Sequence, residues 1–189
     1  MVLNNSSCTP QHGDTPGFKA WQADLEQVRE ESRAVRRAQN SAQAQDQTHA
    51  QIQGWLRDLG LALGFEVWIA ANDRSRPYGH GRLSDGCLET LPPGMAGTAG
   101  ADAVRLIDVV WFERATLSPA AAFEVEHTTS IYSGIVRLLD LALGAPERAV
   151  NGLYLVAPDS READVREQIQ RPAFQAVSHL HMRYLPYSE

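Results

Sequence analysis

The sequence has little cysteine and almost no lysine, and these shortages exclude several classes of protein. Its two cysteines, Cys8 and Cys87, lie far apart without C-x-x-C spacing, which supports neither a disulfide framework nor a thiolate zinc site. Lys19 is the only lysine among 17 basic residues, and the net charge is −6. The chain therefore has no general electrostatic attraction to nucleic acid, and binding to nucleic acid would need a local arginine surface and a metal site.

Long apolar runs are also absent. No run approaches the roughly 20 residues that a helix needs to cross a bilayer, and the polar start of the chain lacks the basic-then-apolar layout of a secretory signal. These absences predict a protein without a membrane partner in a reducing, cytoplasmic setting. The 189 residues, 43% of them hydrophobic, suffice for one domain with a real core and an appendage.

The appendage is predicted at the N-terminus, over residues 1–47, and the domain over residues 48–189. Residues 1–17 are predicted to be disordered, residues 17–37 to form a helix, and the Gln/Ala-rich residues 38–47 to form a connection. The helix is either a solvated lead-in or an arm that pairs with a second copy of the chain in a homodimer. A pairing arm would use a thin apolar stripe of Trp21, Leu25, Val28 and Val35.

The domain is predicted to open with a helix that ends at Gly64 and a strand at 65–71. The strand leads into the polar tripeptide Asn72, Asp73 and Arg74, and the Gly- and Pro-rich residues 75–100 then predict a long excursion with a brief strand near 82–91. The apolar face predicted for the helix, from its 3.6-residue spacing, is Ile52, Trp55, Leu56, Leu59 and Leu63.

Asp108 interrupts an otherwise apolar run at 103–112, which predicts a strand covered on both faces. A carboxylate in such a place is costly unless it is hydrogen-bonded or bound to a metal ion. Capping of a turn or pairing with an arginine would explain Asp108 without chemistry. A hairpin at 113–119, however, returns the chain directly into the next strand, which carries two further acids.

Glu124 and Glu126 are those acids, and they are two residues apart in a strand that starts near Ala120. A strand sends residues at this spacing to one face. Like charges that share a site repel each other, whereas a divalent metal ion relieves the repulsion. Antiparallel pairing would put Asp108 beside Glu124, so that three acids gather at one end of the sheet.

The chain after these acids predicts a helix at 131–143 and a strand at 152–157, which gives a parallel β-α-β unit. Thr128, Thr129 and Ser130 supply capping hydroxyls for the helix. Ser133 and Arg137 lie on one side of this helix. Either both reach a phosphate backbone, or Arg137 forms a surface pair with Asp140. A helix at 161–170, a short helix at 173–177 and a strand at 181–186 complete the chain, with His179 and His181 as structural residues.

This order of elements, with Ile107–Asp108–Val109 on one strand and Glu124–Val125–Glu126 on the next, resembles the PD-(D/E)XK, or restriction-endonuclease-like, nuclease superfamily in an E-x-E form. The separation of sixteen residues (124 − 108) between the acids suits that pattern. The segments FEVEHTTSIYSGIVRLLDL, LYLVAPDSR and RPAF are also similar to uncharacterised bacterial endonuclease-like proteins, over residues 48–189. The resemblance implies an α/β fold with a restriction-endonuclease-like core, a mixed β-sheet flanked by helices, and the N-terminal helical extension.

The resemblance also implies a function: a nuclease that hydrolyses phosphodiester bonds in DNA with Mg²⁺, for which Mn²⁺ can substitute, and by the superfamily's habits a role in defence. Asp108, Glu124 and the Val125 carbonyl are the implied metal ligands, and Glu126 is the implied group that orients or deprotonates water. Phosphate contacts are expected from His127, Ser130, Ser133 and Arg137, and from Asp73 and Arg74. His127 is equally well explained as a capping or packing residue.

Two positions depart from the superfamily pattern. Glu126 stands where members usually have lysine, and the inward polar residues expected on the first core helix are His49 and Gln51, where many members have a glutamate. These departures and the acidic charge favour an alternative, a catalytically degenerate module that binds nucleic acid or a protein partner in a larger system. A phosphate-cradling glycine loop and a nucleophile elbow are missing, so a nucleotide-processing enzyme has no support.

Overall fold

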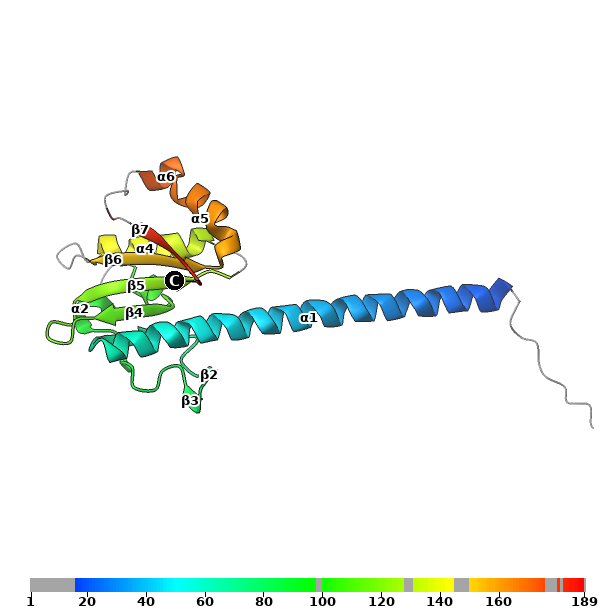
Figure 1. The fold of residues 1–189 in the computed structure, drawn as a ribbon, viewed down its shortest axis with the longest axis horizontal. Coiled ribbons are helices and arrows are strands. Elements are labelled where there is room, and N and C mark those ends of the chain that lie inside the picture. The colour runs from blue at the N-terminus through cyan, green and yellow to red at the C-terminus, as the bar shows by residue number, and fades with distance from the viewer. Residues whose placement is uncertain are drawn as a thin grey trace, which may run out of the picture. The chain divides into compact units, whose positions relative to one another are not determined.

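A computed structural model describes residues 16–97, 100–127, 131–144, 150–175, 180 and 182–188 of the chain. The chain divides into two units, residues 1–44 and residues 45–189, and the second holds the sheet and the cores on both of its faces. This unit is α/β, with a mixed five-stranded sheet flanked by helices (Figure 1). The predicted fold class is confirmed.

The first helix, α1, runs without a break over Pro16–Ala62, so the predicted connection at 38–47 is wrong. Those ten residues contain no glycine or proline and nothing else that ends a helix. Gly64 ends α1 as predicted. Its φ of 88° and the hydrogen bonds from Gly64 N to Leu61 O and from Phe65 N to Gly60 O form a Schellman motif. The predicted stripe at Trp21, Leu25, Val28 and Val35 lies outside the described side chains.

The sheet has the strand order β1-β4-β5-β6-β7. Strands β1 (Glu66–Ile69), β4 (Val109–Phe112) and β5 (Pro119–Val125) form an antiparallel meander. Strands β6 (Gly152–Ala157) and β7 (Met182–Pro186) continue the sheet in parallel with β5. The predicted hairpin between β4 and β5 and the parallel β-α-β unit are therefore confirmed.

Each face of the sheet is covered by its own apolar core. Helix α4 (Ile131–Gly144) and helix α5 (Glu162–Ile169) lie on one face, together with the short helices α2 (Pro93–Ala96), α3 (Ala101–Val104) and α6 (Pro172–Gln175) (Figure 1). The last turns of α1 cover the other face through Ile52 and Leu56, and the Trp111 indole donates a hydrogen bond of 3.0 Å to the Leu56 carbonyl. The buried face of α1 is narrower than predicted, because Trp55, Leu59 and Leu63 are exposed.

The chain between β1 and β4 differs most from the sequence prediction. The excursion contains a small hairpin of β2 (Pro77–Tyr78) and β3 (Gly81–Arg82) in place of the strand predicted near 82–91. The apolar run at 103–112 divides into the end of α3 and the strand β4, so Asp108 precedes the strand instead of lying in its middle. Val104 and Ile107 are buried like strand residues, and apolar composition alone does not distinguish a buried helix from a buried strand.

Helix α5 and strand β7 agree with their predicted positions to within one or two residues. A short 3₁₀ turn at Asp159–Arg161 precedes α5. The predicted helix at 173–177 is α6, of which residues 176 and 177 lie outside the described part. His179, His181 and the hydroxyls of Thr128, Thr129 and Ser130 also lie outside it.

Candidate functional site: a buried cluster of carboxylates

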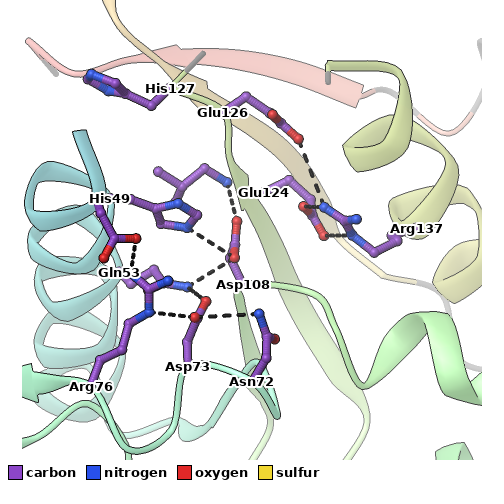
Figure 2. Close-up of polar contacts among 12 residues, drawn as sticks. His49, Gln53, Asn72, Asp73, Arg76, Asp108, Glu124, Glu126, His127 and Arg137 are labelled. Carbon is purple, nitrogen blue, oxygen red and sulfur yellow. Dashed lines mark hydrogen bonds and ion pairs between the residues drawn. The ribbon is translucent and has the colours of Figure 1, made fainter. Parts of the chain in front are cut away.

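Buried polar side chains gather in one place in the described part of the chain. These side chains, each at most 8% exposed, are Gln53, Asp73, Asp108, Glu124 and Glu126. They come from α1, the loop after β1, the turn that enters β4 and the end of β5. Asp108 lies between Gln53 and Asp73 on one side and the two glutamates on the other (Figure 2). Burying four carboxylates together is unfavourable unless cations or hydrogen-bond donors compensate, so this cluster is where function is to be sought.

Asp108 lies at the centre because it ends the turn that enters β4. Its backbone carbonyl accepts a hydrogen bond from Ala70, and Val109 pairs with Phe123, so Asp108 lies across from Glu124 as predicted. Asp108 Oδ2 accepts a 2.7 Å hydrogen bond from the backbone N–H of Val125. The other oxygen, Oδ1, faces α1. The carboxylate therefore ties the two acid-bearing strands to the helix.

On the α1 side, two polar residues one helical turn apart reach Asp108 Oδ1. Gln53 Nε2 donates to it at 2.9 Å and to Asp73 Oδ2 at 2.8 Å, and His49 Nε2 lies 3.2 Å from Asp108 Oδ1. Arg76 holds the other oxygen of Asp73 through a 2.6 Å ion pair. Figure 2 shows His49 and Gln53 directed at Asp108 and Arg76 beside Asp73.

Sequence reasoning found only part of this half of the site. It expected His49 and Gln51 to face inward, but Gln51 is exposed and Gln53 is fully buried. The spacing of His49 and Gln53 at i and i+4, in phase with the buried Ile52 and Leu56, was the signal that would have found Gln53. The role of Arg76 had no such signal, because its contacts depend on how the loop folds back to α1.

On the α4 side, Arg137 binds the two glutamates. Its Nε and Nη2 donate to the two oxygens of Glu124 at 2.8 and 2.5 Å, and Nη2 lies 3.9 Å from Glu126 Oε1. Both glutamates therefore point to one face of β5, as their spacing predicted. Arg137 was expected to contact phosphate or Asp140, and its pairing with Glu124 was not anticipated.

Gly134 allows α4 to pack this closely against the glutamates. A Cβ atom at this position would lie 2.7 Å from Glu126 Oε1 and 3.3 Å from Glu124 Cβ, so any larger residue would have to displace the Glu126 carboxylate. Glycine costs about 1 kcal/mol relative to alanine inside a helix. Gly134 therefore allows α4 to approach the glutamates closely, at the cost of a less stable helix.

The environment shifts the protonation of these groups. Burial raises the pKa of Glu124 well above its ordinary value, and the hydrogen bonds from Arg137 only partly oppose this effect. The same bonds raise the pKa of Arg137, which stays charged. Burial lowers the pKa of His49, but the hydrogen bond and the charge of Asp108 outweigh it, so the pKa of His49 is raised. The site therefore favours positive charge and disfavours a further negative charge.

The remaining predicted phosphate contacts lie around this cluster in varied surroundings. His127 leaves the end of β5 and its Nδ1 lies 3.2 Å from the Tyr187 hydroxyl. Burial and the charges of Asp108 and Glu126 raise the pKa of that hydroxyl to about 12. Arg74 donates to the Leu88 carbonyl and stacks its guanidinium over Trp68 at 4.9 Å. Ser133 is half-buried on α4, and Ser130 lies outside the described residues.

Comparison with known proteins gives the chain a family. Residues 30–189 match the family described as the C-terminal domain of the type II restriction enzyme NmeDI. The chain belongs to this family. The type II restriction enzyme NmeDI of Neisseria meningitidis serogroup C is 34% identical over 145 residues, which cover 74% of this chain and 40% of that enzyme. The chain thus spans about 40% of the length of this curated relative. No solved structure gives a significant match.

The family match therefore confirms the predicted relation to restriction endonucleases. The acids of this chain form two arrangements that share Asp108: one with Glu124 and Glu126 on the sheet, the other with His49 and Asp73 beside α1. Among the described residues, no helix is long and apolar enough to cross a membrane.

Proposed function

We propose that this chain is the catalytic core of a metal-dependent endonuclease that hydrolyses phosphodiester bonds in DNA. The observation that carries the proposal is that the buried acids among the described residues all gather near Asp108. The family to which the chain belongs takes its description from a type II restriction enzyme. Structural roles alone rarely bring four buried carboxylates together, because each destabilises the fold unless it is compensated.

Asp108 and Glu124 would hold Mg²⁺, for which Mn²⁺ can substitute, and the Val125 carbonyl is the proposed further ligand. The donor set fits such an ion, since Mg²⁺ is typically bound by one or two carboxylates that leave room for water and substrate phosphate. The ion, when bound, would neutralise negative charge that develops on the phosphate during hydrolysis. Arg137 compensates the charge of Glu124 in this structure, so binding of the ion would require Arg137 to give up a Glu124 oxygen.

The residues around this pair have separate proposed roles. Glu126 would accept a proton from the attacking water, because its carboxylate lies beside that of Glu124 and is 8% exposed. Arg137, released from Glu124, would contact the phosphate backbone, as would Ser133 on the same helix. His127, Ser130, Asp73 and Arg74 stay proposed contacts to nucleic acid. This assignment corresponds to the E-x-E form of the PD-(D/E)XK pattern, with Glu126 in place of lysine.

An alternative function is a non-catalytic module that binds nucleic acid or a protein partner. A specific contact favours it: both oxygens of Glu124 are bound by Arg137, so an arginine can serve permanently as the cation of this pair. A homodimer formed through α1 stays a prediction that goes with either function.

Cleavage of plasmid and single-stranded DNA with Mg²⁺ or Mn²⁺ tests the proposal. We expect cleavage by the unmodified chain and a loss of at least about a hundredfold in Asp108→Asn and Glu124→Gln. Asp102→Asn is the matched control, because this carboxylate on α3 is fully exposed and only loosely paired with Arg105. Cleavage that survives both substitutions would remove the site from the mechanism. No cleavage with any substrate and metal, together with retained DNA binding, would establish the alternative.

A further inference from the structure

A single atom of Gln53 lies between two carboxylates on the α1 side of Asp108. Gln53 Nε2 is 2.8 Å from Asp73 Oδ2 and 2.9 Å from Asp108 Oδ1, and all three side chains are buried. Two carboxylate oxygens that converge on one point, from a loop and from the start of a strand, form an arrangement that suits a cation. The amide nitrogen, a donor with partial positive charge, occupies that point in this structure.

His49 completes the set of donors. The ligand atoms of His49, Asp73 and Asp108 all lie within 4.8 Å of one another. Two ligands that each lie about 2.1 Å from one ion are at most about 4.2 Å apart, so the three side chains need only a small contraction to share a cation. Their backbone positions are fixed by α1, by the turn after β1 and by the start of β4, which makes the site largely preformed.

The second sign of a ligand is the other end of the Gln53 amide. Gln53 is 0% exposed, and its Oε1 is a buried oxygen without a hydrogen-bond partner in the structure. A buried unsatisfied acceptor costs about 1–3 kcal/mol, which is difficult to explain in a side chain that serves only structure. Turning the amide over would present Oε1 to the point between the carboxylates, where an oxygen is a ligand for a metal ion and a repulsive neighbour without one.

The charge of the cluster points the same way. Its four buried carboxylates face the guanidiniums of Arg76 and Arg137, and Arg76 also pairs with the exposed Asp46, so negative charge exceeds positive charge before His49 is counted. Arg76 pairs with Oδ1 of Asp73, and Oδ2 of Asp73 accepts the hydrogen bond from Gln53. A dication at this point would balance the excess.

We propose that His49, Asp73 and Asp108, with the amide oxygen of Gln53, form a binding site for a first-row transition-metal dication such as Mn²⁺ or Zn²⁺. Imidazole is a ligand that Zn²⁺ prefers and that Mn²⁺ accepts beside carboxylates, whereas Mg²⁺ and Ca²⁺ favour oxygen ligands alone. The inference rests on the proposed function in one respect, since Asp108 belongs to both sites. This site differs from the Asp108–Glu124 site in its position: the ion would lie against α1, on the side of Asp108 away from the glutamates that Arg137 binds.

Binding of Mn²⁺ to the EDTA-treated chain, without DNA, tests this site. The concentration of unbound Mn²⁺ is followed by electron paramagnetic resonance, and ¹⁴N coupling to bound Mn²⁺ is measured by pulsed methods. We expect ¹⁴N coupling in the unmodified chain and its loss in His49→Gln. We also expect affinity to fall at least about tenfold in both His49→Gln and Asp73→Asn. His80→Gln, an exposed histidine in the β2–β3 turn, should bind Mn²⁺ as the unmodified chain does. The ¹⁴N coupling should persist in Glu124→Gln, because the two proposed sites share only Asp108. Mg²⁺ should displace Mn²⁺ only at a concentration at least about ten times higher than the concentration at which Mn²⁺ half-fills the site.

Three results would overturn the inference: no Mn²⁺ binding by the folded chain, ¹⁴N coupling unchanged in His49→Gln, or binding lost in Glu124→Gln but kept in Asp73→Asn. Circular dichroism confirms that each variant is folded, and Asp73→Asn provides a second test if His49→Gln is not. The proposed nuclease is judged separately by cleavage. A chain that binds Mn²⁺ through His49 without cutting DNA would support this site and refute the nuclease, and cleavage without ¹⁴N coupling would do the reverse.

Discussion

Replacing Arg137 with methionine should destabilise the fold strongly, because it leaves a fully buried carboxylate without its cation. Glu124 is 0% exposed and loses two hydrogen bonds of 2.8 and 2.5 Å in this variant. A hydrogen bond to a charged group contributes about 1.5–3 kcal/mol, so two give about 3–6 kcal/mol. Broken buried ion pairs cost about 3–5 kcal/mol, and we adopt this range because Glu124 can take up a proton. For a chain of this size the melting temperature should fall by about 6–20 °C.

The size of this effect should depend on pH. The pKa of Glu124 in the folded chain is raised above its ordinary value, so the stability it contributes is fully present below that ordinary value and is lost as pH rises through the folded pKa. Loss of Arg137 raises the folded pKa further and extends this window upward. The penalty of Arg137→Met should therefore be larger at about pH 8 than at about pH 5.

Urea unfolding in EDTA, followed by tryptophan fluorescence, measures the free energy of unfolding of each variant. Arg166→Met is the matched control, because its ion pair with Glu162 is exposed and should contribute at most about 1 kcal/mol. Adding Glu124→Gln to Arg137→Met removes the buried charge and should restore at least half of the loss. A penalty below about 1 kcal/mol at alkaline pH, or no recovery in the double variant, would refute the reasoning.

Three further predictions use other parts of the chain. Gly134→Ala should keep the free energy of unfolding within about 1 kcal/mol, since alanine favours the helix. The same change should lower any DNA cleavage at least about tenfold by displacing Glu126, and unchanged cleavage would contradict this. Leu56→Ala should cost about 2–5 kcal/mol in urea unfolding because its side chain is 8% exposed, whereas Leu59→Ala, at 51% exposed, should cost under about 1 kcal/mol. Burial raises the pKa of the Cys87 thiol to about 11. In Cys8→Ser, alkylation of Cys87 near neutral pH should therefore be roughly a hundredfold slower in the folded chain than in urea. Equal rates would contradict a buried environment for Cys87.

Local chemistry determined much of the fold, because its signals lie within a few residues. Gly64 ends α1 through its left-handed backbone, and the two-residue spacing of Glu124 and Glu126 sends both to one face. The hairpin between β4 and β5 and the helix after β5 followed from short apolar runs separated by turn residues. These features required no knowledge of distant contacts.

The predictions failed where a pattern allowed two outcomes and packing chose between them. Residues 38–47 could have been a linker, but nothing in them stops a helix. The run at 103–112 is apolar enough for a strand throughout, yet its first part is a helical turn packed against α4. Helical spacing suggested Leu59 and Trp55 as core residues, and the position of the sheet decided that only Ile52 and Leu56 of that stripe are buried.

The sequence by itself determined the class of the protein and its acidic residues: an α/β chain with Asp108, Glu124 and Glu126 at adjacent ends of two neighbouring strands. Only the tertiary structure decided which partners these acids have. The contacts of Asp108 with His49 and Gln53 join residues 59 and 55 positions apart, and that of Glu124 with Arg137 joins a strand to a helix on the face of the sheet. Such pairings depend on how helices pack on the sheet, and packing is set by the whole core, so no local spacing specifies them.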